Sequence, residues 1–277
     1  MVRVAYQGER GAYSELAIAA RWRSAEPVPR RECADVVRAV TSGAADIGLL
    51  AVENTLAGSV LPSWDALVSC DDVVATDELV LGIHHCLVAP PGATLAGIRR
   101  VESHPVALAQ CRGLFERHAH LRPRAAYDTA GAARAVARAR DPRRAALASR
   151  AAAEHYGLAV LAADVEDRPD NQTRFLAVAA EGAPLAPGTP ARTIFGFATA
   201  NVPGALWCAL APFAAEGLNL GSILSRPAGN PWTYRFIIEI EHAAADPALD
   251  RALAALAAVT TWRRSLGTVA RGAPGAC

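Results

Sequence analysis

The sequence predicts an α/β protein in two parts, a longer part that alternates strands and helices and a shorter βαββαβ unit. Three observations lead to this prediction. Strand-length apolar runs alternate with helix-like apolar spacing over residues 1–180, which favours a parallel or mostly parallel sheet covered on both faces. A proline-containing stretch without apolar periodicity indicates a linker over residues 181–191. The patterns over residues 192–270 follow the ferredoxin-like order, and residues 271–277 form an expected tail.

Short apolar runs that end in polar residues or glycine predict the strands, and apolar residues three and four positions apart predict the helices. In the first part we expect strands at 2–8, 45–54, 72–90 (one bent strand or two), 98–105, 124–129, 143–149 and 172–180, and helices at 11–22, 34–43, 59–70, 105–119, 130–140 and 150–157. In the second part we expect strands at 193–200, 218–227, 232–241 and 262–270, and helices at 204–217 and 248–259. Gly217 is the expected stop of its helix, and Pro212 predicts a kink or an early end there.

The charge balance excludes several classes of function. The 277 residues include 28 Lys+Arg and 27 Asp+Glu, so the net charge is +1, and no long-range field favours nucleic acid or an anionic membrane. Every basic residue is arginine, which excludes Schiff-base chemistry on lysine, a Walker-A lysine and a kinase strand lysine. A small anionic substrate must therefore be held by arginine, hydroxyls or backbone N–H groups.

The sequence shows no pattern typical of a transmembrane segment, a signal peptide or a metal-binding motif. No apolar run reaches the roughly 20 residues that cross a bilayer, and MVRVAYQG lacks a signal-peptide pattern, so we expect a soluble cytoplasmic protein. The six cysteines form no C-x-x-C pair. His84, His85 and Cys86 lie in an apolar run where neighbours point to opposite faces, so we expect packing there, or one histidine near a pocket, and no metal site.

Five polar segments lie where predicted strands begin or end, which is where open α/β sheets bind ligands. Helix capping and turns account for much of this polarity when each segment is taken alone. In a regular last strand, Thr173 and Phe175 share one face and Arg174 points to the other. The segments are residues 7–14, 52–60, 102–105 with Gln110, 127–132 and 170–175.

In combination, the segments GAYSE, VENTLAGSV, ESHP-x4-Q, DTAGAA and DNQTRFL resemble the prephenate dehydratase family, and are similar to the arogenate dehydratases within it. The second part resembles an ACT regulatory domain, with GALW and LSRP near that family's GAL-V and ESRP motifs. The resemblance runs from Val4 to about Val269. It implies a catalytic domain over residues 1–180 with the fold of type II periplasmic binding proteins, two α/β lobes with the site in the cleft, and chain crossings near residues 79–84 and 160–175.

Members of this family convert prephenate to phenylpyruvate by losing the ring hydroxyl and CO2 together. The site must hold two carboxylates, protonate the departing hydroxyl and keep the ring from water. The resemblance implies Thr173 as the hydrogen-bond donor to that hydroxyl or a proton relay, Glu53 as an acid or orienting group, and Asn54 beside them. Implied substrate contacts are Ser14, Thr55, Ser103, His104, Gln110, Arg174 and Phe175. The implied substrate is prephenate or arogenate, and no cofactor or metal is implied.

The resemblance also implies feedback regulation by phenylalanine at an ACT-mediated dimer or tetramer interface. The matching effector residues are Gly204, Ala205, Leu206, Ser225, Arg226 and Pro227. Leu224 stands where the motif has glutamate, and Trp207 stands where a smaller residue is usual. Three alternatives stay open: an arogenate dehydratase, a prephenate decarboxylase that forms no aromatic ring, and an amino-acid sensor without catalysis.

Overall fold

The computed structural model describes residues 1–229 and 231–271, and their contacts form two compact units. The first unit comprises residues 1–63 and 79–175, and the second comprises residues 64–78 and the described residues from 176 onward. Residues 64–78 thus group with the C-terminal part of the chain, although they precede the expected linker by more than a hundred positions. Among the described helices, none has the length and apolar character needed to span a membrane.

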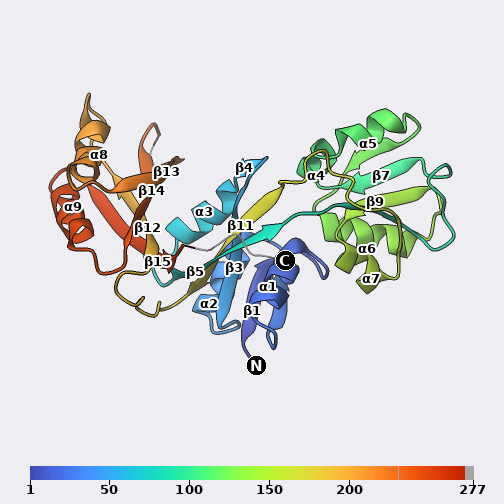
Figure 1. Cartoon of the computed structure of the whole chain (residues 1–277), viewed down its shortest axis with the longest axis horizontal. Coiled ribbons are helices and arrows are strands. Elements are labelled where there is room, and N and C mark those ends of the chain that lie inside the picture. Colours follow the sequence, from blue (N-terminus) through green and yellow to red (C-terminus); the bar gives the residue numbers. More distant parts are fainter. Residues whose placement is uncertain (230, 272–277) are drawn as a thin grey trace. The chain divides into compact units, whose positions relative to one another are not determined.

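The first sheet of unit 1 carries the N-terminal lobe (Figure 1). Its strands run in the order β11-β3-β1-β2, with β4 added to β3, and β1 pairs in parallel with both β2 and β3. Helices α1 and α2 pack on β1 and β3 and bury small apolar side chains there. The elements are β1 Arg3–Gln7, α1 Tyr13–Arg21, β2 Glu26–Arg30, α2 Cys33–Thr41, β3 Ile47–Asn54, β4 Gly58–Ser59, α3 Leu61–Val68 and β11 Gln172–Ala179.

The second sheet carries the other lobe and mixes parallel with antiparallel pairs. Its order is β10-β6-β9-β7-β8; β7 runs parallel to β8 and β9, whereas β6 runs antiparallel to β9 and β10. Figure 1 shows α6 and α7 on one face and α4 and α5 on the other. The elements are β6 Cys86–Ala89, β7 Arg100–Ser103, α4 Pro105–Ala109, α5 Arg112–Arg117, β8 Arg122–Ala125, α6 Thr129–Ala139, β9 Arg144–Ala148, α7 Arg150–Tyr156 and β10 Ala159–Ala162.

The chain passes between these two sheets twice, at residues 83–85, after β5 (Val74–Gly82), and at residues 163–171. The two crossings lie side by side, because the Ile83 N–H donates to the Asn171 carbonyl at 2.8 Å and the Val165 N–H donates to the His85 carbonyl at 3.0 Å. Two α/β lobes joined by paired crossings are the arrangement that the resemblance implies.

Unit 2 has the predicted ferredoxin-like order. Its sheet runs β13-β14-β12-β15, and α8 and α9 bury Phe195, Phe213 and Ile238 against one face. Strand β15 pairs with β12 on one side and with β5 on the other, the latter through a single parallel pair, Gly267 with Ala75. A Cβ on Gly267 would clash with the Ala75 carbonyl oxygen. The elements are β12 Pro190–Ala198, α8 Ala205–Ala215, β13 Asn219–Pro227, β14 Tyr234–Ala243, α9 Pro247–Ala257 and β15 Trp262–Ala270.

Most predicted elements are present, with several differences. The predicted helix 105–119 is two short helices, and the strand expected at 124–129 lies at Arg122–Ala125. Strands β2, β4 and β10 were not predicted, and the sheets are mixed rather than mostly parallel. Helix α8 continues through Pro212 to Ala215, and β12 begins at Pro190, within the expected linker. The tail beyond Arg271 lies outside the described residues.

Candidate active site

A pocket of about 280 Å³ lies between the two lobes of unit 1. The loop after β1, the ends of β3 and β11, the crossing at 83–85 and the loops before α4 and α6 all contribute to its wall. This volume suits one ring with short substituents. Among the sequence-predicted residues, Ser14, Asn54, His104, Gln110, Thr173 and Phe175 line it.

Thr173 presents its hydroxyl to this pocket with a defined orientation. Asn54 Nδ2 lies 3.0 Å from Thr173 Oγ1, and Asn54 Oδ1 accepts the backbone N–H groups of Leu56 at 3.1 Å and Ala57 at 2.9 Å. The two backbone donors fix which end of the Asn54 amide carries the N–H groups. Asn54 Nδ2 shares its two protons among Thr173 Oγ1, the Gln172 carbonyl at 2.9 Å and Asn171 Oδ1 at 2.8 Å. Because this nitrogen cannot accept, the Thr173 proton remains to be donated to another group.

Gln110 and Asn171 extend this fixed orientation across the pocket. Gln110 Nε2 donates to Asn54 Oδ1 at 3.1 Å, so the other end of its amide is the acceptor, and Asn171 Nδ2 donates to Gln110 Oε1 at 3.1 Å. Asn171 is 1% exposed, and Asn54 Nδ2 also lies 2.8 Å from Asn171 Oδ1. The side-chain amides of buried Asn171 and of partly buried Asn54 and Gln110 thus hydrogen-bond to one another, and each bond fixes the orientation of the next amide.

The network ends on His85 and Tyr13. His85 Nε2 lies 3.0 Å from Gln110 Oε1, which is an acceptor, so His85 Nε2 carries a proton. Burial lowers the pKa of His85 and raises the pKa of Tyr13 well above its usual value, so the histidine is neutral and the phenol protonated. His85 Nδ1 then accepts the Tyr13 proton at 2.8 Å, while the His84 carbonyl oxygen, 2.7 Å away, is an alternative acceptor.

Four sequence-predicted residues lie outside the pocket wall. Arg174 and Glu53 pair with each other at 2.9 Å, on the strand faces opposite Thr173 and Asn54. Thr55 Oγ1 accepts the Gln172 N–H at 3.0 Å and holds the start of β11 against the end of β3. Ser103 is fully buried and donates to the Leu147 carbonyl at 2.7 Å, between β7 and β9. In this arrangement Arg174, Glu53, Thr55 and Ser103 support the site and do not touch a ligand in the pocket.

Four further residues line the pocket that sequence reasoning did not name as site residues: Tyr13, His85, Tyr127 and Asp128. It did expect one histidine of residues 84–85 near a pocket, and His85 is that residue. No local pattern marks Tyr13 and His85 as partners, because 72 positions separate them. Both Tyr127 and Asp128 lie in the polar segment 127–132, where Asp128 or Thr129 was expected to cap a helix; Asp128 does cap α6, with Oδ1 accepting the Gly131 N–H. The aromatic and acidic residues of that segment were the signal that could have placed them in the pocket.

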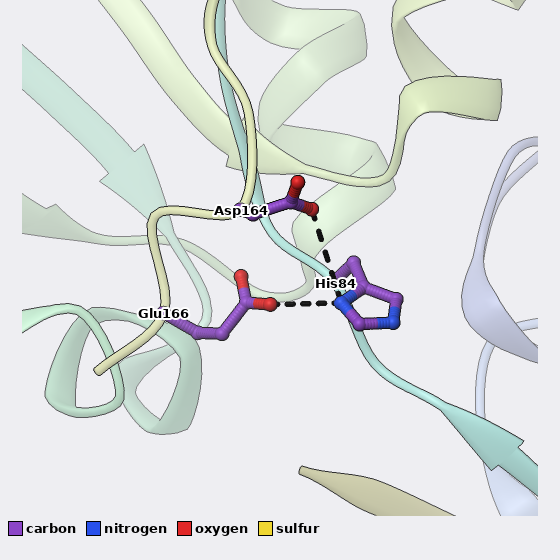
Figure 2. Close-up of side chains that lie close together, drawn as sticks. All are labelled: His84, Asp164 and Glu166. Atoms are coloured by element: carbon purple, nitrogen blue, oxygen red, sulfur yellow. Dashed lines mark hydrogen bonds and ion pairs between the residues drawn. The ribbon is translucent and has the colours of Figure 1, made fainter. Parts of the chain in front are cut away.

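A second group of titratable residues lies at the crossings, outside the pocket wall. Figure 2 shows the His84 imidazole between two carboxylates, with Nδ1 2.9 Å from Glu166 Oε1 and 3.8 Å from Asp164 Oδ1. Glu166 Oε2 also accepts the His85 N–H at 2.8 Å. The group has three potential metal ligands within 4.8 Å, but His84 and Asp164 are exposed, and the ion pair between the two crossings accounts for the arrangement.

The expected effector residues lie in unit 2 and form two groups. Gly204 begins α8 at a φ of 80°, and Ala205 and Leu206 line a cavity of about 160 Å³ together with Trp232. Ser225, Arg226 and Pro227 lie on β13, outside that cavity wall. Arg226 makes a bidentate ion pair with Asp65 of α3, with both distances at 2.6 Å. Trp207 is 73% exposed.

Comparison with known proteins decides the family, because the family model for prephenate dehydratase matches residues 4–183, more than half of the chain. The chain belongs to the prephenate dehydratase family. This member is 39% identical over 279 residues to arogenate dehydratase/prephenate dehydratase 2 of Arabidopsis thaliana, covering 96% of this chain and 72% of that protein. It is 37% identical to a bifunctional N-acyl-homoserine lactone acylase/prephenate dehydratase of Komagataeibacter europaeus, covering 95% of this chain and 94% of that protein.

The solved structures extend the match over both units of this family member. The prephenate dehydratase from Arthrobacter aurescens, solved in complex with L-Phe, superposes with a TM-score of 0.91 at 31% identity. The match covers 98% of this chain and 90% of that chain. The predicted α/β fold, with a two-lobed catalytic domain before a βαββαβ unit, is confirmed.

Proposed function

We propose that this chain is a prephenate dehydratase, a carbon–oxygen lyase that converts prephenate to phenylpyruvate, CO2 and water in phenylalanine biosynthesis. The observation that carries the proposal is the Thr173 hydroxyl, which lines the pocket while Asn54 donates to its oxygen at 3.0 Å. A hydroxyl that accepts a hydrogen bond is a better donor in turn. Placed at the departing ring hydroxyl, Thr173 stabilises the oxygen as the C–O bond breaks.

The balance of the reaction needs one proton. As the carboxylate leaves as CO2, the electron pair of its C–C bond moves into the ring, the ring C–O bond breaks, and the hydroxyl leaves as water after taking a proton. The Thr173 hydroxyl is far too basic to be a free acid, so its part is donation or relay. Glu53 supports the site through Arg174, because neither residue lines the pocket.

The carboxylates of the substrate meet neutral donors in this pocket. Ser14 lies in the first turn of α1, a nine-residue helix whose N-cap residue, Ala12, provides no side-chain cap. The positive end of that helix is available to a carboxylate. His104 caps α4 through Nδ1, which accepts the Val106 N–H at 3.3 Å, so the neutral ring carries its proton on Nε2. Phe175, which is 1% exposed, and Ile83 of the first crossing line the pocket and offer the ring apolar contacts.

The same proposal includes phenylalanine as the effector and a homodimer or homotetramer assembled through unit 2, in the cytoplasm. The L-Phe complex of the Arthrobacter aurescens relative supports the effector, and the cavity beside Ala205 and Leu206 offers a place for a small side chain. Size-exclusion chromatography with light scattering, with and without phenylalanine, tests the assembly. A monomer in both conditions would contradict this part of the proposal.

The deciding experiment incubates the purified chain with prephenate and follows phenylpyruvate by its absorbance in alkali. We expect phenylpyruvate to form, less of it to form with added phenylalanine, and none to form with Thr173→Ala. Consumption of prephenate without an aromatic product would indicate the decarboxylase alternative. No consumption at all would indicate the sensor alternative, and either result would overturn the proposal.

A further inference from the structure

One carboxylate oxygen in the pocket wall has no hydrogen-bond partner among the described residues. Asp128 lines the pocket, and its Oδ1 accepts the Gly131 N–H as the cap of α6. Its Oδ2 is buried and unpaired, and it faces the loop after β1, where a Cβ on Gly8 would lie 3.8 Å away. Because helix capping uses only Oδ1 of this carboxylate, it does not explain why Oδ2 is buried without a partner.

In the part of the chain that the structure describes, no cation of the pocket wall pairs with this carboxylate, although Arg30, Arg31 and Arg134 line a second cavity that Asp128 also borders. No arginine lies among the described residues that line the pocket, and the chain contains no lysine. Arg134, the cation further along α6, pairs with Glu9 at 2.9 Å. His85 is neutral, and burial lowers the pKa of His104. Burial also raises the pKa of Asp128, and the hydrogen bond from Gly131 and the charge of Arg134 only partly oppose that rise.

Prephenate and arogenate differ at one group, and an unpaired carboxylate would interact differently with that group in each of them. Prephenate carries two carboxylates and a ketone, and arogenate carries an ammonium group in place of the ketone. An ammonium supplies both the positive charge and the N–H donors that an unpaired carboxylate lacks. A ketone supplies neither, and its oxygen would face the carboxylate as a second acceptor.

We propose that Asp128 binds the α-ammonium group of arogenate and so determines how this pocket chooses between arogenate and prephenate. The inference rests on the proposed dehydratase function and adds a second substrate to it. Arogenate enters the cleft with its ammonium between the loop at Gly8 and the start of α6, and Asp128 Oδ2 accepts from it. Thr173 meets the ring hydroxyl of either substrate.

The test measures kcat/KM for both substrates in the wild type and in Asp128→Asn. Asparagine is as good an N-cap as aspartate, so α6 is retained while the charge is lost. We expect the ratio of kcat/KM for arogenate to that for prephenate to fall by more than about tenfold. Asp128→Glu keeps the charge and should recover part of the ratio. Asp246→Asn is the matched control, because the Asp246 carboxylate is the N-cap of α9 and does not line the pocket.

Each outcome decides the inference. A fall in the ratio for Asp128→Asn with an unchanged ratio for Asp246→Asn supports it. Equal losses for both substrates would assign Asp128 a purely structural role and overturn it, as would a wild type that dehydrates prephenate but not arogenate. A wild type that consumes neither substrate overturns the proposed function itself, and that result is distinct from an altered ratio.

Discussion

Asn54 Nδ2 lies 3.0 Å from Thr173 Oγ1, and this bond joins the last residue of β3 to the second residue of β11. Strands β3 and β11 are more than a hundred residues apart in the sequence, yet their ends place a hydrogen-bond donor next to an acceptor. Because two backbone N–H groups fix the Asn54 amide, the direction of the bond follows from the fold.

Replacing the Thr173 hydroxyl should remove most turnover. Thr173→Ala loses the donor to the leaving group, so kcat should fall about 10²–10³-fold, the usual cost of one such donor. Thr173→Ser keeps the hydroxyl and should stay within about tenfold of the wild type. Initial rates at saturating substrate measure kcat, and melting temperatures verify folding. An equal fall in kcat in Thr173→Ala and Thr173→Ser would show that turnover does not depend on the Thr173 hydroxyl.

His85 acts through Gln110 as a positioning residue, and its removal should lower kcat more than it raises KM. In His85→Phe, Gln110 Oε1 loses the donor 3.0 Å away, and an unmade hydrogen bond of this kind costs about 1–2 kcal/mol. The expected loss in kcat is about tenfold. His84→Phe is the matched control, because His84 is the preceding residue and does not line the pocket. Similar kinetics for both variants would contradict the role of His85.

Gly11 lets the two lobes meet, and a side chain there should hold them apart. Gly11 has a φ of 81°, and a Cβ on it would lie 2.5 Å from Ala152 Cα at the start of α7. Ser149 Oγ donates to the Gly11 carbonyl at 2.6 Å across the same contact. Gly11→Ala should therefore raise KM and lower the stability by about 1–3 kcal/mol beyond the backbone penalty.

Gly43→Ala measures that backbone penalty alone. Gly43 has a φ of 71°, and nothing lies within 4 Å of a Cβ placed there. Urea unfolding gives the loss of stability in Gly11→Ala and Gly43→Ala, and steady-state kinetics give KM. The comparison separates the backbone penalty, which both variants share, from the steric clash with Ala152, which only Gly11→Ala has. Equal destabilisation with an unchanged KM in both would show that the contact with Ala152 does not hold the lobes together.

Asp128 should reduce stability at neutral pH. Burial raises its pKa in the folded protein above the unfolded value, so the folded state binds the proton more tightly. Stability is then lost as the pH rises through the folded pKa, and it is recovered on acidification. Asp128→Asn should melt at a higher temperature than the wild type at pH 8, and the difference should narrow toward pH 4. If the difference in melting temperature between Asp128→Asn and the wild type grew larger toward pH 4, the prediction would be contradicted.

The ion pair between Arg226 and Asp65 should affect the phenylalanine response. Both distances are 2.6 Å, and the pair joins the expected effector motif on β13 to α3, which begins one residue after the pocket residue Val60. Asp65→Asn should shift the phenylalanine concentration for half inhibition by about threefold or more, and leave uninhibited kcat/KM within about twofold. Glu216→Gln, which breaks the Arg251 pair between α8 and α9, is the control. An equal shift in both variants would contradict a specific link.

Elements with strong apolar periodicity could be predicted from the sequence. Strands that contain prolines or have very few residues could not, because they show no clear period. Strand β2 has the sequence EPVPR, and two prolines argue against a strand except at a sheet edge, where β2 lies. Strand β10 has only four residues, too few to show a period. The predicted helix 105–119 is interrupted at residues 110–111, where Gln110 turns into the pocket.

Alternation along strands could have predicted more of the site than the motif match alone. Thr173 and Phe175 face the pocket and Arg174 does not, as the period of two requires. The same rule applied to β3 separates Glu53 from Asn54, and only Asn54 faces the pocket. The meeting of Tyr13 with His85 could not be predicted, since it depends on how a helix start and a chain crossing come together in space.

The network from Asn54 to Tyr13 has a consequence for the solution conditions the site tolerates. Its members are three amides, a neutral imidazole and a phenol, and its direction is set by the N–H groups of Leu56 and Ala57. Dissolved ions screen charges but leave short bonds between neutral groups in place. Raising the ionic strength should therefore weaken the capture of anionic substrate and leave the maximal rate of the bound complex nearly constant.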